Sequence, residues 1–135
     1  MQNIYQSPLL TLIATERPGY PATGSISVKT VDLWIDDIKK AGVVSIICLL
    51  HPEEHLQYYT QLQGGGLIEY YEKCGFNVSH IPYKDYQTPL LSDACMDEIY
   101  KAYKELPKPV LIHCSAGIGR TGAAIDHILK MEGFK

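Results

Sequence analysis

The sequence predicts an α/β fold, with three αβα layers built around a central, mostly parallel sheet of about four or five strands. Segments with the pattern of strands alternate with segments of helical periodicity, and this alternation favours parallel strands with helices on both faces. Residues 43–50 and 110–113 are nearly continuous apolar runs, as expected of strands covered on both faces. The 135 residues suffice for one such domain and are too few for two.

The first half of the chain contains the predicted N-terminal strands, one helix and one buried strand. Residues 9–14 are predicted to form a strand that can pair with residues 4–6. Apolar residues recur at helical spacing over residues 31–38, and Gly42 stands where a C-terminal cap belongs. Residues 43–50 follow as the buried strand, so the order here is strand, strand, helix, strand.

The second half is predicted to continue the alternation. Its elements, in order, are helical segments at 57–63 and 67–74, a strand at 76–81, a helix at 92–105, a strand at 110–113 and a helix at 120–130. Ser92 is the expected N-cap of its helix. Active sites of parallel sheets lie at the carboxyl ends of strands, so the chemistry is expected just after residues 50, 81 and 113.

The composition narrows the classes of function. Hydrophobic residues make up 46% and charged residues 20%, which excludes a disordered or fibrous chain. Twelve Lys and Arg against fifteen Asp and Glu give a net charge of −3, so we expect neither nucleic acid nor a membrane surface as a partner. The longest nearly apolar run, residues 41–50, is too short to cross a bilayer, and the N-terminus lacks the pattern of a signal peptide.

The cysteines favour a reducing, cytoplasmic location. They lie far apart in the sequence, and no Cys-x-x-Cys pair suggests structural zinc. We expect reduced thiols and no cofactor. The four are Cys48, Cys74, Cys95 and Cys114.

The strongest chemical signal is the segment HCSAGIGRTG at residues 113–122. A cysteine leaves a buried strand and enters a turn that opens a helix, where inward backbone N–H groups and the helix dipole form a cradle for an anion. Gly117 and Gly119 permit the backbone conformations and close approach that such a cradle needs. Arg120 can clamp two oxygens of a tetrahedral anion. The cradle should also stabilise a thiolate at Cys114, and a thiolate facing a bound phosphate attacks phosphorus in line.

The pattern His-Cys-x5-Arg-Thr-Gly after a strand resembles the phosphate loop of the cysteine-dependent protein tyrosine phosphatase superfamily. In size the chain is similar to its compact dual-specificity and small microbial members. The resemblance covers most of the chain and implies a single phosphatase domain over residues 1–135, which needs no metal. It implies that Cys114 is the nucleophile and that phosphate is bound by Ser115, Ala116, Gly117, Ile118, Gly119 and Arg120.

The resemblance also implies three supporting roles. Asp85, on a loop after the strand at 76–81, should be the general acid and then the general base; the alternatives are a surface aspartate or a role for Asp93. Thr121 should donate its hydroxyl to the Cys114 sulfur, unless it only caps the helix. His113 should fix the loop and support the thiolate, unless it is merely packed in its strand.

The chain departs from the family pattern at its end. Members usually continue past the helix that follows the phosphate loop, whereas this sequence stops at Lys135. The domain is therefore minimal, truncated at its C-terminal helices, or covered there by a partner or a second copy. We expect an exposed apolar patch beside Ile125, Ile128 and Leu129.

The loop also bears on substrate class. Ser115, Ala116 and Ile118 carry no charge, whereas family members acting on polyphosphoinositides tend to have lysines there. A singly phosphorylated protein or peptide is favoured, with phosphotyrosine first and phosphoserine or phosphothreonine left open. Two alternatives are a pseudophosphatase or scaffold that binds phosphoresidues with little turnover, and, less favoured, a redox enzyme resembling arsenate reductase.

Three further signals carry weaker hypotheses. The segment HPEEH at residues 51–55 fits the H-x-x-E-H pattern of some zinc proteases. A joint between a strand and a helix is the favoured interpretation, because proline suits the first turn of a helix. Glu53 or Glu54 could then orient Arg120. Tyr83 or Tyr86, beside the expected acid, could stack on a substrate ring. Cys48 is expected to be a core residue, with a redox partnership to Cys114 as the alternative.

Overall fold

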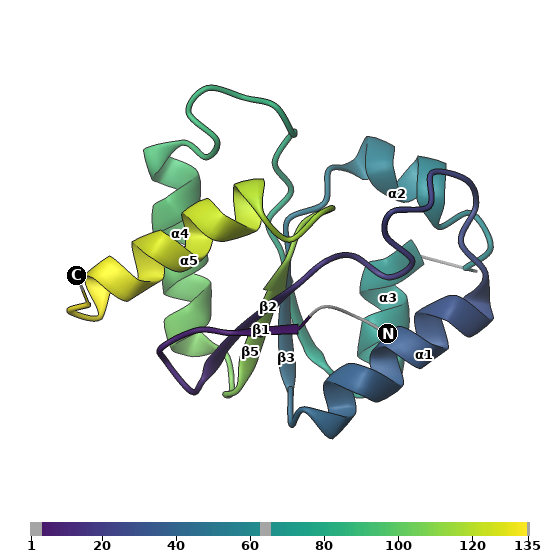
Figure 1. Cartoon of the computed structure of the whole chain (residues 1–135), viewed down its shortest axis with the longest axis horizontal. Coiled ribbons are helices and arrows are strands. Elements are labelled where there is room, and N and C mark those ends of the chain that lie inside the picture. The colour runs from purple at the N-terminus through teal and green to yellow at the C-terminus, as the bar shows by residue number, and fades with distance from the viewer. Residues whose placement is uncertain (1–3, 63–65, 135) are drawn as a thin grey trace.

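A mixed sheet of five strands forms the centre of the computed structural model, which describes residues 4–62 and 66–134 (Figure 1). β1 is antiparallel to β2, and all other neighbours pair in parallel. The predicted α/β class with a mostly parallel sheet is therefore confirmed. In spatial order the strands are β1 (Ile4–Gln6), β2 (Leu12–Thr15), β5 (Val110–His113), β3 (Ser45–Cys48) and β4 (Asn77–His80).

Helices cover both faces of this sheet. Figure 1 shows α4 and α5 on one side and α1, α2 and α3 on the other. Because successive residues of a strand point to opposite faces, Ile46 and Leu111 join one hydrophobic cluster, whereas Ile47 and Ile112 join the other. The helices are α1 (Val28–Lys40), α2 (Pro52–Tyr58), α3 (Gly66–Lys73), α4 (Asp93–Glu105) and α5 (Gly119–Met131).

The register of the sheet brings four loops to one edge. In β5, His113 pairs with Thr15 of β2 on one side and with Cys48 of β3 on the other, and Cys48 in turn pairs with His80 of β4. These four residues end parallel strands, so the loops that follow them converge at the carboxyl edge. The sheet thus brings together the loops at which the sequence predicts the chemistry.

Several predicted boundaries agree with the structure. Gly42 follows α1 with φ +88°, the left-handed conformation typical of a helix end. Ser92 caps α4 by accepting a hydrogen bond from the backbone N–H of Cys95 at 3.1 Å. None of the described helices is long and apolar enough to span a bilayer.

The segment between β3 and α3 differs from the prediction. A helix was expected at residues 57–63, but α2 begins at Pro52 and ends at Tyr58. Proline fits the first turn of a helix, and Glu53 and Glu54 in that turn favour the helix dipole. Gln63, the last residue of the predicted helix, lies outside the described residues.

The strands predicted at residues 4–6 and 110–113 agree with β1 and β5, whereas the other three predicted strands are longer than the observed ones. The chain turns at residues 9–11, so β2 starts only at Leu12, whose N–H donates to the Leu9 carbonyl. β3 ends at Cys48, although Leu49 and Leu50 remain fully buried. The apolar runs therefore predicted burial correctly but overestimated the length of these strands.

The expected apolar patch on the last helix is wrong for two of its three residues. Ile128 is fully buried and Ile125 is 5% exposed, because α5 packs both into the cluster it shares with α4. Leu129 is only half-buried. The side of α5 that carries Leu129 borders a cavity.

Candidate active site

The loop between β5 and α5 is built around a buried cysteine. Cys114 is 3% exposed and follows the last residue of β5 directly. Gly117 has φ +77°, and a Cβ at this position would lie 2.7 Å from the Thr15 carbonyl oxygen. The close approach of β2 and the positive φ both require glycine here. The carbonyl of Ser115 accepts a hydrogen bond from the Arg17 N–H at 2.8 Å, which ties the loop to the end of β2.

Arg120 is fully buried, and Glu54, Asp85 and the backbone carbonyls of Tyr83 and Leu49 contact its terminal nitrogens. Its Nη1 donates to Glu54 Oε1 and to the Tyr83 carbonyl, each at 2.7 Å. Its Nη2 donates to Glu54 Oε2 at 3.0 Å and lies 3.4 Å from Asp85 Oδ2. Among the described residues Nε has no hydrogen-bond partner. The guanidinium is therefore fixed at its terminal nitrogens and keeps one buried donor for a ligand.

The ion pair changes the pKa of both partners. Burial alone would raise the pKa of Glu54, but the hydrogen bond and charge of Arg120 outweigh it and hold that pKa below its ordinary value. Burial likewise disfavours the charged Arg120, yet Glu54 raises the pKa of the guanidinium above its ordinary value. Of the two glutamates expected to orient Arg120, the structure selects Glu54.

Asp85 lies on the loop between β4 and α4, close to Arg120. One carboxylate oxygen, Oδ2, faces the guanidinium at 3.4 Å, and the other accepts a hydrogen bond from the N–H of Tyr86 at 3.0 Å. Tyr86 itself has φ +60° and is 92% exposed, whereas Tyr83 packs partly into the core. The loop thus brings Asp85, the expected acid, close to Arg120 and leaves the Tyr86 ring exposed.

His113 connects the loop to the core. Its Nδ1 lies 2.9 Å from the Cys114 carbonyl, which can only accept, so Nδ1 carries the proton and donates. In the neutral ring Nε2 then accepts a hydrogen bond from the Tyr71 hydroxyl at 3.0 Å. Burial raises the pKa of Tyr71 well above its ordinary value and keeps that hydroxyl protonated. His113 is therefore both packed in its strand and a direct support of the Cys114 backbone.

Thr121 does not make the contact that the resemblance implied. Its side chain is fully buried, and its Oγ1 has no hydrogen-bond partner among the residues that the structure describes. The hydroxyl therefore does not donate to the Cys114 sulfur in this conformation. It lines a cavity beside the loop instead.

Sequence reasoning missed Arg17, a second buried arginine beside the loop. Its Nε donates to Ser115 Oγ at 3.0 Å, its Nη2 donates to the Ala22 carbonyl at 2.6 Å, and its guanidinium stacks at 3.9 Å over the Tyr58 ring. The residue is 2% exposed. Its place two residues after the end of β2, at the carboxyl edge of a parallel sheet, is the signal that could have found it.

The other thiols do not form a redox pair in the structure. All four cysteines are free, and Cys48 is fully buried in the strand beside β5. Burial raises the pKa of Cys48 to about 12, so its thiol stays protonated at neutral pH. The structure therefore shows Cys48 as a core residue.

Two residues of the H-x-x-E-H segment, His51 and Glu54, take part in hydrogen bonds at the carboxyl edge of the sheet. The Glu53 N–H donates to His51 Nδ1 at 3.3 Å, and the His51 N–H donates to Glu54 Oε1 at 3.0 Å. Glu54 is also the partner of Arg120. No cluster of three His, Cys, Asp or Glu side chains suited to a metal occurs within residues 4–62 and 66–134 as described. The side chain of His55 lies outside the described part.

A cleft of about 220 Å³ opens next to these groups. Carboxylates dominate its charge, with one lysine at the rim. Its lining residues are His51, Glu53, Glu54, Tyr58, Lys84, Asp85, Tyr86 and Ser115. A buried thiol, a fixed guanidinium and a nearby carboxylate on one edge of the sheet together suit capture and cleavage of a phosphate ester.

Comparison with known proteins gives a family and a fold. The model of the family Tc-R-P, described as polymorphic toxin system, DSP-PTPase phosphatase, matches residues 37–133. This match includes the site residues described above except Arg17, its partner Ala22 and the end of β2. No curated protein has a significantly matching sequence.

Solved structures of several phosphatases share the fold, among them these three. A mutant form of Tk-PTP aligns with a TM-score of 0.68 at 21% identity, over 94% of this chain and 71% of that one. A putative phosphatase from Shewanella putrefaciens gives 0.62 at 18%, over 98% and 72%. The core catalytic domain of the PP-IP phosphatase SIW14 from S. cerevisiae gives 0.58 at 17%, over 92% and 63%. At such identities these likenesses show the fold alone.

Proposed function

The chain belongs to the Tc-R-P family of DSP-PTPase phosphatases, and on this premise we propose that it hydrolyses phosphotyrosine through a phosphocysteine intermediate on Cys114. The phosphatase class and the cysteine-based fold are shared with the family and with the similar structures. The substrate, the roles of individual residues and the independence from metal are the proposal. A cytoplasmic location likewise stays a prediction.

The observation that carries the proposal is the state of Arg120. Glu54, Tyr83 and Asp85 engage its two terminal nitrogens, while its buried Nε has no partner among the described residues. A buried donor without an acceptor costs roughly 1–3 kcal/mol. A phosphate oxygen at the loop would remove this cost, so the site is prepared for an anion before one arrives.

The first step transfers the phosphoryl group to sulfur. The Cys114 thiolate attacks phosphorus, the new Sγ–P bond forms, and the ester P–O bond opposite breaks. Asp85 gives its proton to the departing phenolate oxygen, while the loop amides and Arg120 hold the equatorial oxygens. The proximity of Asp85 to Arg120 supports this assignment, because an acid next to the phosphate clamp is within reach of the leaving group.

The second step hydrolyses the phosphocysteine and regenerates the free enzyme. Asp85, now a carboxylate, takes a proton from water, the water oxygen attacks phosphorus, and the Sγ–P bond breaks to release phosphate and the thiolate. Thr121 is the residue expected to ease thiolate departure. Because its hydroxyl has no partner here, it must rotate toward Cys114 to do so.

Charge and shape support a singly phosphorylated protein substrate. Ser115, Ala116 and Ile118 add no charge at the loop, and the cleft carries Glu53 and Glu54. An acidic rim disfavours a ligand with several phosphates. The exposed ring of Tyr86 supports phosphotyrosine, since it can stack on the phenyl ring. Hydrolysis of phosphoserine and phosphothreonine, the dual-specificity alternative, needs a shallower approach to Cys114.

A second candidate is a phosphoresidue-binding module with little turnover. The unpartnered Thr121 hydroxyl favours it, because capture needs only the cradle and Arg120, whereas release of the intermediate needs more. Phosphopeptide binding without phosphate release, at high protein concentration, would select this alternative.

The test compares p-nitrophenyl phosphate and phosphotyrosine as substrates, with EDTA present. We expect turnover of both, its loss in Cys114→Ser, and a fall in kcat of roughly 10²–10⁴-fold for phosphotyrosine in Asp85→Asn. The fall should be smaller for p-nitrophenyl phosphate, whose leaving group needs less help from an acid. Full activity in Cys114→Ser would overturn the proposal, and so would a strict requirement for a divalent metal.

A further inference from the structure

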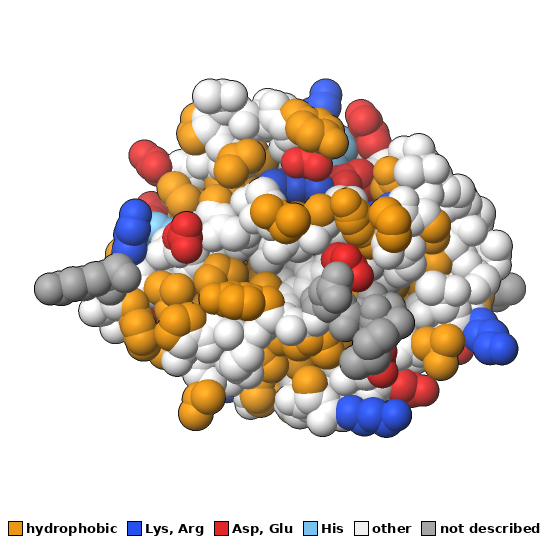
Figure 2. Space-filling model, in the orientation of Figure 1, with side chains coloured by type: hydrophobic (Ala, Val, Ile, Leu, Met, Phe, Trp, Pro, Cys, Tyr) orange, Lys and Arg blue, Asp and Glu red, His pale blue; other side chains and the backbone are white. Residues whose placement is uncertain are grey.

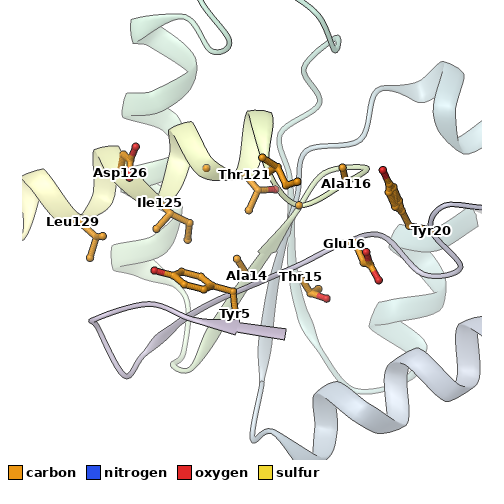
Figure 3. Close-up of a pocket in the computed structure, with 13 residues that line it drawn as sticks. Tyr5, Ala14, Thr15, Glu16, Tyr20, Ala116, Thr121, Ile125, Asp126 and Leu129 are labelled. Carbon is orange, nitrogen blue, oxygen red and sulfur yellow. The ribbon is translucent and has the colours of Figure 1, made fainter. Parts of the chain in front are cut away.

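A second, larger cavity lies on the other side of the phosphate loop from the cleft. Its volume is about 540 Å³, against about 220 Å³ for the cleft. Ser115 lines the cleft, whereas the next three residues, Ala116, Gly117 and Ile118, line the larger cavity. Figure 3 shows this cavity between the β1–β2 hairpin, α5 and the loop. The two hollows are therefore neighbours, separated by the tip of the loop, where Ile118 is 76% exposed.

The walls of the larger cavity are mainly apolar. Tyr5 from β1, Ile125 and Leu129 from α5, and Tyr20 from the loop after β2 contribute to them (Figure 3). Hydrophobic side chains also gather over α5 and the hairpin in the space-filling view (Figure 2). Nothing in the proposed reaction uses these residues, so this surface is available for another purpose.

The charged groups of this cavity are all of one sign. Glu16 and Asp126 line it, and none of the described lining residues is Lys, Arg or His. Arg17 lies near one end, with its guanidinium 5.5 Å from the Tyr20 ring; it is buried, its Nε and Nη2 donate to Ser115 and Ala22, and its Nη1 has no hydrogen-bond partner among the described residues. Two carboxylates without a cation in the lining favour a positively charged occupant.

A buried polar atom adds a second observation. Thr121 lines the cavity, is fully buried, and leaves its Oγ1 without a hydrogen-bond partner among the described residues. Buried polar atoms of proteins are normally paired. A ligand with a hydrogen-bonding group that reaches this end of the cavity would satisfy it.

We propose that this cavity is a substrate subsite for a Lys or Arg side chain close to the phosphotyrosine in the same polypeptide. The long aliphatic stem of such a side chain matches the apolar walls, and its cation matches the carboxylate at one end of the cavity, either Glu16 beside the loop or Asp126 on α5 (Figure 3). The rings of Tyr5 and Tyr20 add cation–π attraction. The proposal rests on the proposed function, since it takes the phosphotyrosine to lie in the neighbouring cleft.

The position of the subsite sets the geometry of the substrate. An extended peptide advances about 3.3 Å per residue, so a side chain a few residues from the phosphotyrosine can cross the loop tip and enter the cavity. Ile118, exposed between the two hollows, would contact the intervening residue. The preference should therefore depend on one or two peptide positions rather than on overall peptide charge.

The test uses phosphotyrosine peptides in which one Lys is moved through the flanking positions, each compared with its Glu analogue. At the best position we expect kcat/KM to favour Lys by about threefold to tenfold, as one or two partly exposed ion pairs allow. The double variant Glu16→Gln, Asp126→Asn should remove this preference through KM. Its turnover of p-nitrophenyl phosphate, which does not reach the cavity, should stay unchanged and show that the fold is intact.

The matched control is Glu72→Gln, Asp36→Asn, which removes two exposed carboxylates elsewhere and should keep the preference. Binding of the same peptides with a non-hydrolysable phosphonate to Cys114→Ser, measured by calorimetry, separates the subsite from catalysis. The subsite would be supported if the Lys peptide binds more tightly than the Glu peptide and if the double variant Glu16→Gln, Asp126→Asn removes that difference. This result would hold even if no turnover occurs and the proposed function fails. An absent preference, or one that the double variant retains, would overturn it.

Discussion

Glu54 accepts hydrogen bonds from both terminal nitrogens of Arg120, at 2.7 and 3.0 Å, and turns the guanidinium so that its Nε remains unengaged. The two residues are 66 positions apart in the sequence and meet because β3 and β5 are neighbours in the sheet. The glutamate lies in the first turn of α2, and the arginine near the start of α5. A single ion pair thus connects the first turn of α2 to the start of α5 and fixes the guanidinium that we propose binds phosphate.

Loss of Glu54 should therefore weaken both the fold and oxyanion binding. In Glu54→Ala the buried Arg120 keeps only Asp85 as a charged partner, and breaking a buried ion pair costs about 3–5 kcal/mol, less here because Glu54 is partly exposed. We expect a clear drop in the free energy of unfolding, measured in urea, and weaker inhibition by vanadate. Glu53→Ala is the control, since Glu53 makes no contact with Arg120 among the described interactions. Equal effects of the two substitutions would contradict the role of Glu54.

The same pair predicts acid sensitivity. The pKa of Glu54 in the folded state is below its ordinary value of 4.5, so its ionisation stabilises the fold. This stabilisation is complete above about pH 4.5 and is lost as the pH falls through the lowered pKa. In urea titrations from pH 7 to pH 3, Glu54→Gln should remove part of the decline seen in the native sequence below pH 4.5. An unchanged slope in the variant would show that other carboxylates cause the decline.

The elements that sequence reasoning located best are those with local causes. The N-cap at Ser92 and the glycine after α1 depend on residues next to each other in the chain, and the Cys114 to Arg120 spacing is contained in one loop. The partnership of Glu54 with Arg120 depends on which strands lie side by side, so the sequence offered only Glu53 or Glu54 as candidates. The orientation of the Thr121 hydroxyl depends on packing around the loop, which no spacing encodes.

Arg17 is a residue of the site that the sequence analysis missed, and its contribution can be measured. The guanidinium holds Ser115 Oγ at 3.0 Å and stacks on Tyr58, so Arg17 acts on the phosphate loop as a positioning residue. Arg17→Lys keeps the charge but loses the planar fork. We expect a lower kcat/KM for p-nitrophenyl phosphate, mostly through KM, and a loss of stability of about 1.5–3 kcal/mol for the charge-assisted hydrogen bonds.

A double-mutant cycle on KM distinguishes an effect of Arg17 on the position of the loop from an effect on the stability of the fold alone. If Arg17 acts through the loop serine, Ser115→Ala should produce part of the same change, and adding it to Arg17→Lys should have little further effect. Strictly additive effects on KM would show that Arg17 influences the site by another route.

Gly117 gives a prediction about backbone fit. An alanine Cβ there would lie 2.7 Å from the Thr15 carbonyl oxygen, and the residue would have to keep φ +77°. Strain of this kind costs on the order of 1–3 kcal/mol. Gly117→Ala should lower the free energy of unfolding by about that amount and weaken tungstate binding, because the loop must move away from β2. Gly24→Ala, at a position with nothing within 4 Å of the added Cβ, should leave both quantities unchanged.

The two thiols on neighbouring strands should differ sharply in reactivity. Burial raises the pKa of Cys48 to about 12 and closes it to solvent, so iodoacetate should not modify it in the folded protein. Cys114 is the proposed nucleophile and lies near Arg120, so at pH 6 iodoacetate should modify it at least about tenfold faster than it modifies glutathione. Mass spectrometry of peptides would identify the modified residue, and phosphate should protect it by occupying the cradle. Slow alkylation of Cys114, or protection absent at saturating phosphate, would mean that the loop does not hold an ionised sulfur, and the proposed nucleophile would then lack its reactive form.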